Sequence, residues 1–188
     1  MTLGQIWPPF LKKVAKSSLH MKIWPRNLGN MAKSIVVGRG RERAMLTTML
    51  ASDRAELLAL YGRRRIGKTH LIRHFVEPKA GTYLEVTGTK DGSAALQRRR
   101  FREALESTMT GGQILPDFRS WDDALSYMTQ LVERRAASSS DPIVLFFDEL
   151  PWLATPRSKL LESIDYYWNA HLSRLPQVKL ILLSLIHI

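Results

Sequence analysis

The chain has 188 residues, of which 45% are hydrophobic and none is cysteine. That length suits one ordinary domain with a real core, and the lack of cysteine excludes disulfides and thiolate metal sites. A reducing cytoplasm is the compartment that we expect, although cysteine-free proteins also occur elsewhere. No stretch reaches the roughly 18 apolar residues that a membrane span needs, so we expect a soluble protein with no membrane partner.

The formal net charge is +11, but most of the excess lies in the first 41 residues. These hold eight Lys and Arg residues and no acid, and the remainder carries 28 − 8 = 20 basic against 17 acidic residues, a net +3. We interpret residues 1–33 as a basic tail, either disordered or translated upstream of a true start at Met31; a transit peptide is less favoured. Residues 34–188 are expected to form one nearly charge-balanced domain.

Taken in chain order, the apolar patterns predict alternating strands and helices. Residues 35–37 lead into a turn at Gly38, and residues 45–50 have helical spacing. Further along, we expect strands at 55–61, 82–86, 143–147 and 178–183, and helices at 69–76, 93–108, 120–137 and 158–172. Apolar strands without polar alternation, separated by helices, are typical of a mainly parallel sheet covered on both faces. The predicted fold class is therefore α/β.

The most specific motif is YGRRRIGKTH at residues 61–70. Residues 62–69 match the phosphate-loop pattern G-x-x-x-x-G-K-[ST], between a predicted strand and a predicted helix. Glycines let backbone N–H groups turn toward an anion, Lys68 can reach β- and γ-phosphates, and the Thr69 hydroxyl can ligate Mg²⁺. The residues expected around a nucleotide are Gly62, Arg63, Arg64, Arg65, Ile66, Gly67, Lys68, Thr69 and His70.

The three arginines of this loop are not required by that chemistry, because the loop binds phosphate mainly through backbone N–H groups. We expect their side chains at the outer rim of the loop, where a subunit, a domain or nucleic acid could meet them. One of them could add positive potential to the phosphate site.

A second motif, IVLFFDE, ends the predicted strand at 143–147. A buried strand that delivers Asp148 at its end suits Mg²⁺ held between this carboxylate and a nucleotide, with Thr69 as the other protein ligand. Glu149 can orient or deprotonate an attacking water, so Glu149 and Lys68 are the candidate catalytic residues. The alternative is a core strand capped by two solvated acids.

Together, these motifs resemble a known family. VVGR at 36–39 with Glu42, YGRRRIGKTHLI, LFFDELPWLATPRS and the later YYWN are similar to the archaeal-type ATPase family, which is AAA-related and STAND-related and also widespread in bacteria. The resemblance covers about residues 34–182. It implies a three-layer α/β/α core, ATP rather than GTP, a strand between the phosphate-loop strand and the Asp148 strand, and Val37 and Gly38 near the adenine.

The last residues depart from the family pattern. In relatives the final matched strand ends in a small polar sensor, whereas here the end reads LSLIHI and Ser184 is the only candidate stand-in. Relatives continue into another strand, a helical lid and a winged-helix region. We therefore expect a C-terminally truncated core, with any protein partner or self-association depending on the region beyond it.

The leading hypothesis is ATP binding and Mg²⁺-dependent hydrolysis. One alternative is a nucleotide-gated switch with little turnover, and another is a DNA-associated ATPase whose DNA-binding part lies outside this sequence. The run QRRRFR at 97–102 could be a nucleic-acid patch, but Phe101 falls on the apolar side and acids follow at pairing distance, which favours a solvated helix face. Arg157 could reach a nucleotide or a neighbouring subunit.

Overall fold

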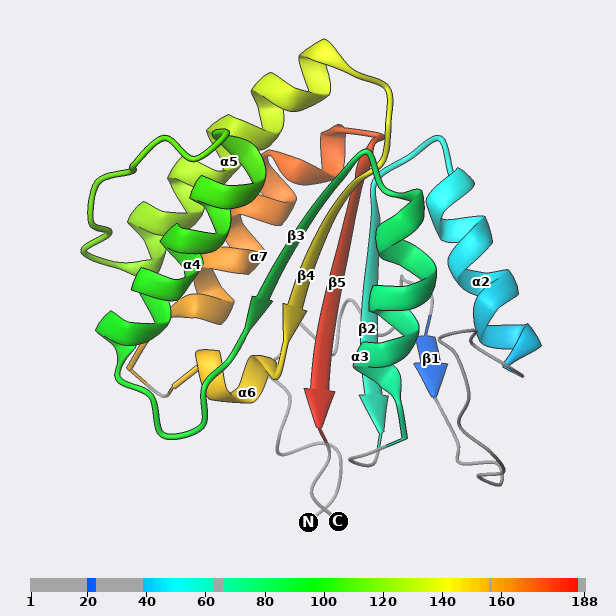
Figure 1. The fold of residues 1–188 in the computed structure, drawn as a ribbon, viewed down its shortest axis with the longest axis horizontal. Helices are drawn as coiled ribbons and strands as arrows, with labels where there is room; N and C mark the ends of the chain where they lie inside the picture. The colour runs from blue at the N-terminus through cyan, green and yellow to red at the C-terminus, as the bar shows by residue number, and fades with distance from the viewer. Residues whose placement is uncertain (1–19, 23–38, 63–65, 156, 186–188) are drawn as a thin grey trace.

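The computed structural model describes residues 20–22, 39–62, 66–155 and 157–185. Within them, parallel strands form one sheet in the order β1-β2-β5-β4-β3 (Figure 1). The strands are β1 (His20–Lys22), β2 (Glu56–Gly62), β3 (Thr82–Thr87), β4 (Ile143–Asp148) and β5 (Val178–Leu185). β5 thus lies between β2, which leads into the phosphate loop, and β4, which ends at Asp148. This confirms the strand order that the family resemblance implied.

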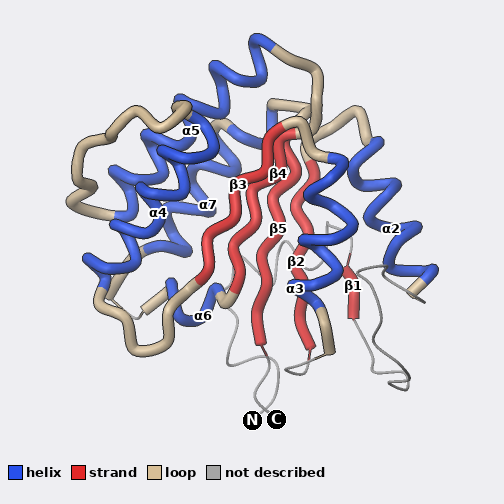
Figure 2. Tube along the Cα trace, in the orientation of Figure 1, coloured by secondary structure: helices blue, strands red, loops and turns tan. Residues whose placement is uncertain are grey.

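Helices cover both faces of the sheet (Figure 2). They are α2 (Gly40–Ala51), α3 (Lys68–Leu71) with its continuations η2 (Ile72–Val76) and η3 (Glu77–Lys79), α4 (Ala94–Met109), α5 (Trp121–Ser138), α6 (Leu150–Leu153), α7 (Leu160–Ala170) and η4 (Leu172–Arg174). The α2 and α3–η2 helices pack on one face, and α4, α5 and α7 pack on the other. The expected α/β/α layering is confirmed.

β4 shows why its sequence is apolar at every position. All six of its residues are buried, and successive side chains enter opposite cores. Val144 and Phe146 pack with α2 and η2, whereas Leu145 and Phe147 pack with α4, α5 and α7. Because both faces of a central parallel strand are covered, a continuous hydrophobic run replaces alternation.

Two long helices are capped by serines at their first turns. The Ser93 hydroxyl accepts a hydrogen bond from Leu96 N at 3.2 Å, and the Ser120 hydroxyl accepts one from Asp123 N at 3.0 Å. These caps satisfy backbone donors that the first helical turn leaves without partners. The caps fix the starts of α4 and α5.

The segment expected to be a tail contributes the edge strand β1, in which His20 pairs with Ala59 of β2. The division of the chain near residue 33 remains a prediction. None of the helices in the described ranges is long and apolar enough to cross a bilayer.

Candidate functional site

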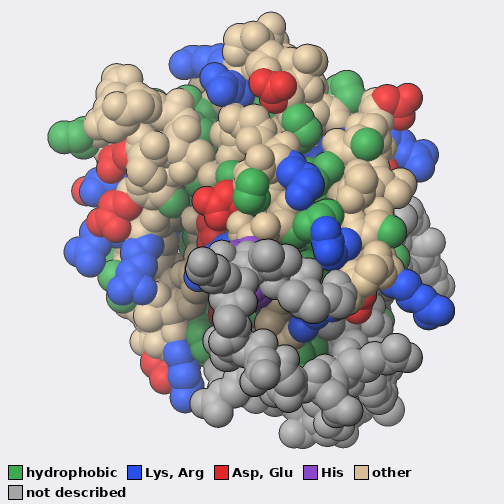
Figure 3. Space-filling model, turned by 45° about the vertical axis from the view of Figure 1, so that its right-hand side comes forward, with side chains coloured by type: hydrophobic (Ala, Val, Ile, Leu, Met, Phe, Trp, Pro, Cys, Tyr) green, Lys and Arg blue, Asp and Glu red, His purple; other side chains and the backbone are tan. Residues whose placement is uncertain are grey.

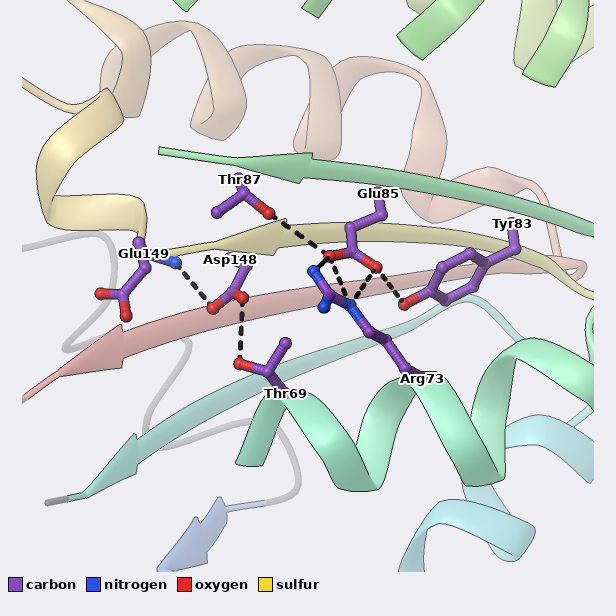
Figure 4. A network of polar contacts seen from close by, with 7 residues as sticks. All are labelled: Thr69, Arg73, Tyr83, Glu85, Thr87, Asp148 and Glu149. Atoms are coloured by element: carbon purple, nitrogen blue, oxygen red, sulfur yellow. Dashed lines mark hydrogen bonds and ion pairs between the residues drawn. The ribbon is translucent and has the colours of Figure 1, made fainter. Parts of the chain in front are cut away.

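The two motifs meet at the carboxyl ends of the strands. β2 delivers the phosphate loop, and α3 begins at Lys68, within the last residues of the motif. β4 delivers Asp148, and the Thr69 hydroxyl donates a hydrogen bond to Asp148 Oδ2 at 2.9 Å across 79 positions of sequence (Figure 4). Parallel strands that end at one edge of the sheet therefore assemble one site from two separate segments.

Gly67 gives the loop its direction into the helix. Its φ of 75° lies in the left-handed region, which glycine adopts without steric cost. The guanidinium of Arg39 donates to the carbonyls of Ile66 and Gly67, the latter at 3.3 Å. Arg39 thus braces the loop from the segment before α2, and this contact was not foreseen from the sequence.

Lys68 is almost fully buried, with 4% of its surface exposed. Burial lowers the pKa of its ammonium, and the negative charges of Glu149 and Asp148 counteract that shift. The side chain therefore lies at the start of a helix, within the electrostatic influence of two carboxylates. This is the arrangement in which a bound phosphate would find both backbone N–H groups and a positive charge.

Asp148 is also buried and accepts two hydrogen bonds. One comes from Thr69 Oγ1 and the other from Glu149 N to Oδ1, at 2.9 Å. Burial raises the pKa of Asp148, while these two hydrogen bonds lower it. A hydroxyl and a carboxylate oxygen in direct contact are hard donors of the kind that Mg²⁺ takes alongside phosphates, so the residues present fit that ion.

Glu149 sits at a sharp change of backbone direction. Its φ of 51° and ψ of 43° are left-handed, between the end of β4 and the start of α6. As a result, the adjacent carboxylates of Asp148 and Glu149 lie apart, as Figure 4 shows. The two acids are adjacent in sequence, but their carboxylates can therefore interact with different groups.

A polar network on β3 and the phosphate-loop helix borders Asp148 (Figure 4). Glu85 accepts hydrogen bonds from Arg73 Nε at 2.9 Å, the Tyr83 hydroxyl at 3.1 Å and the Thr87 hydroxyl at 3.3 Å. Glu85 raises the pKa of Asp148 and Arg73 lowers it, as minor contributions. We missed this network, although Tyr83, Glu85 and Thr87 share one face of the strand at a spacing of two residues.

The remaining predicted positions divide into two groups. Gly62 ends β2, Ile66 is half-buried, and His70 is exposed on α3, where its ring stacks on His74 at 4.0 Å between centroids. Val37, Gly38, Arg63, Arg64 and Arg65 lie outside the described residues. No group of three His, Cys, Asp or Glu side chains in the described ranges is arranged to bind a metal.

Ser184 comes to the site from β5. It is 7% exposed and pairs with Tyr61 of β2, one residue before Gly62. On its other side, β5 pairs with β4 up to Leu182 and Phe147. The candidate sensor therefore lies at the strand ends between the two motifs.

The basic side chains of residues 97–102 on α4 pair with other groups of the protein. Phe101 is fully buried, Arg99 and Arg102 pair with Glu103 and Glu106, and Arg98 Nε donates to the carbonyl of Phe118 at 2.9 Å. On the face drawn in Figure 3, basic and acidic side chains are interspersed over the described elements. These observations support a solvated helix face over a nucleic-acid patch.

Arg157 lines a cavity of about 580 Å³ between α4, α5, α7 and the segment before α7. The lining comprises Ala94, Arg98, Arg119, Ser120, Trp121, Asp122, Thr155, Arg157, Ser158, Lys159, Glu162, Ser163 and Tyr166, and therefore none of the described phosphate-loop residues. That Arg157 reaches a nucleotide or a neighbouring subunit stays a prediction.

Comparison with known proteins gives an independent view of the chain. A family model described as "AAA domain" matches residues 51–186, which include both motifs. The chain is also similar to an uncharacterized ATP-binding protein of Methanocaldococcus jannaschii, with 46% identity over 43 residues. The aligned part is 23% of this chain and 73% of that protein.

Proposed function

The chain belongs to the AAA family of P-loop ATPases, and on that premise we propose that it binds ATP with Mg²⁺ and hydrolyses it at the Thr69–Asp148 site. The observation that carries this proposal is the direct contact between the two motifs, at 2.9 Å. A phosphate loop alone would support anion binding only. Its contact with a buried strand-end carboxylate supports binding of an anion together with a divalent cation.

Each residue then has a role that its surroundings support. Lys68 and the backbone N–H groups between Gly62 and His70 hold the phosphates, with Thr69 and Asp148 as the protein ligands of Mg²⁺. When bound, Mg²⁺ would neutralise charge that develops on the phosphate oxygens. Val37 and Gly38 would lie near the adenine, as in the family that the sequence resembles.

Glu149 is the candidate that orients or deprotonates the attacking water. Its backbone turn separates its carboxylate from that of Asp148, which is committed to Thr69 and to a backbone N–H. A general base must reach the reacting atoms, and the turn gives the Glu149 carboxylate a direction different from that of Asp148. Ser184, at the strand ends, would sense the terminal phosphate. A cytoplasmic location would supply the nucleotide.

Turnover and binding together test the proposal. In wild-type protein, ATP with Mg²⁺ should raise the melting temperature and release phosphate. Glu149→Gln should keep the thermal shift and lower the turnover rate by about 100-fold or more, as expected for loss of a general base. Glu77→Gln, an exposed acid on η3, is the matched control and should leave turnover unchanged.

The possible outcomes separate the alternatives. The absence of any thermal shift with ATP would contradict the site assignment. A shift without turnover in wild-type protein would favour a nucleotide-gated switch. Full turnover in Glu149→Gln would remove Glu149 from its role.

A further inference from the structure

Gln97 is a buried polar side chain near the start of α4, with 1% of its surface exposed. Its Oε1 accepts a hydrogen bond from Thr89 N at 3.1 Å. Its Nε2 donates to the carbonyl of Thr89 at 2.7 Å and to the carbonyl of Trp152 at 3.2 Å. One amide therefore joins two backbone segments that are 63 positions apart in sequence (152 − 89).

Both segments belong to the surroundings of Glu149. Thr89 follows Gly88, whose N–H donates to the carbonyl of Asp148 at 2.9 Å. Trp152 lies in α6, and its N–H donates to the carbonyl of Glu149 at 2.9 Å. Gln97 thus closes a ring of hydrogen bonds around the turn that carries Glu149.

The turn at Glu149 needs such support. Its left-handed backbone is unfavourable for a residue with a side chain and persists only where the surrounding structure determines it. The loop after β3 contributes through Gly88, where a Cβ atom would lie 2.5 Å from the carbonyl oxygen of Glu149. The loop therefore lies directly against the turn and leaves no room for a side chain at Gly88. Gln97 holds the loop and α6 together.

We propose that Gln97 is a positioning residue that sets the direction of the Glu149 carboxylate through α6 and the loop at Gly88 and Thr89. This inference rests on the proposed ATP hydrolysis. It makes the rate of hydrolysis depend on a residue outside both motifs. It predicts that Gln97 affects the chemical step, which depends on Glu149, and spares nucleotide binding, which depends on Lys68 and the phosphate loop.

The chain offers a matched control in Gln177. Its Nε2 also donates to two backbone carbonyls, those of Ala136 at 3.1 Å and Ser139 at 3.3 Å. Gln177 precedes β5 and therefore lies at the opposite end of the sheet from Asp148 and Glu149. Its loss removes the same kind of hydrogen bonds without touching the site.

The experiment compares Gln97→Met with Gln177→Met in the full chain, using steady-state phosphate release and titration with a fluorescent ATP analogue. Gln97→Met should lower kcat by about 10-fold to 100-fold, the cost of a small misplacement of a catalytic group. Its affinity for nucleotide should stay within about twofold of wild type. Gln177→Met should lower the melting temperature comparably while leaving kcat unchanged.

A double-mutant cycle tests whether Gln97 acts through Glu149. If Gln97 acts only through Glu149, then Gln97→Met should change turnover by less than about twofold when added to Glu149→Gln. Independent, multiplicative losses would overturn the proposal, and so would unchanged kcat in Gln97→Met or equal kcat losses in the two glutamine variants.

Gln97→Glu provides a second variant if Gln97→Met does not fold. It keeps an acceptor for Thr89 N and removes both donors, so it should show the same loss of kcat with retained nucleotide affinity. Failure of both variants to fold would overturn the proposal in favour of a purely structural role. Failure of the proposed function is a separate result, because it would appear as the absence of ATP-dependent phosphate release in wild-type protein.

Discussion

Lys68 and Lys179 are both buried, with 4% and 1% of their surfaces exposed, and they lie near opposite ends of the sheet. Burial lowers the pKa of both ammonium groups. Lys179 Nζ donates to the carbonyls of Ser52 and Pro176, each at 2.9 Å, and to that of Arg54. Negative charges counteract the lowering of the pKa in both cases, from Glu149 and Asp148 for Lys68 and from Glu56 and Asp53 for Lys179.

The comparison shows that burial of a lysine does not identify its role; its neighbours do. Three backbone carbonyls fix the ammonium of Lys179 and join β5 to the segment between α2 and β2. The carboxylates beside Lys68 belong to the candidate site, where an incoming phosphate would compete for the same cation. We therefore expect Lys179 to contribute to folding and Lys68 to contribute to binding.

The largest effect should follow from Lys68→Met. Loss of the ammonium should weaken ATP binding by about 100-fold, which corresponds to about 2.8 kcal/mol. The melting temperature of the nucleotide-free protein should change little. Isothermal titration with ATP and Mg²⁺ measures the affinity, and unchanged affinity would contradict the assignment of Lys68.

Lys179→Met should have the opposite profile. Three backbone carbonyls would lose their donor, so the free energy of unfolding should fall by about 1–3 kcal/mol. Nucleotide affinity should be unchanged, because the residue lies near the far end of the sheet. Urea unfolding measures the stability; if Lys179→Met weakened ATP binding as much as Lys68→Met, the comparison would fail.

The smallest effect concerns Asp148. Because burial raises the pKa of Asp148, its carboxyl group binds a proton more tightly in the folded protein than in the unfolded chain. The free energy of unfolding therefore contains a contribution that decreases as the pH rises through the raised pKa. Asp148→Asn removes that contribution and should raise the melting temperature of the nucleotide-free protein near pH 7.5, by about 2–4 °C per kcal/mol gained.

The pH dependence sharpens this prediction. The difference in melting temperature between Asp148→Asn and wild type should shrink as the pH falls through the raised pKa, because wild-type Asp148 then becomes neutral as well. Scanning calorimetry across this range measures it, and a difference that widens on acidification would contradict the sign.

Local patterns were sufficient for most of the secondary structure. The helices expected at 93–108 and 120–137 match α4 and α5 closely, and the apolar run at 143–147 marked β4 almost to its last residue. The helix α6 (Leu150–Leu153) was missed, because four residues are too short to show a period and Pro151 lowers helical propensity. Pro151 is tolerated there because it occupies the first turn, where a backbone N–H has no intrahelical partner.

The local sequence contains the pieces of the site: a glycine-bounded loop with Lys68 and Thr69, and a strand-end carboxylate at Asp148. The contacts that hold these pieces in place come from the packing of distant segments. The contact of Arg39 with the loop spans 28 positions, and that of Gln97 with Trp152 spans 55. Such contacts depend on how the helices pack against the sheet, and no local period in the sequence encodes that packing.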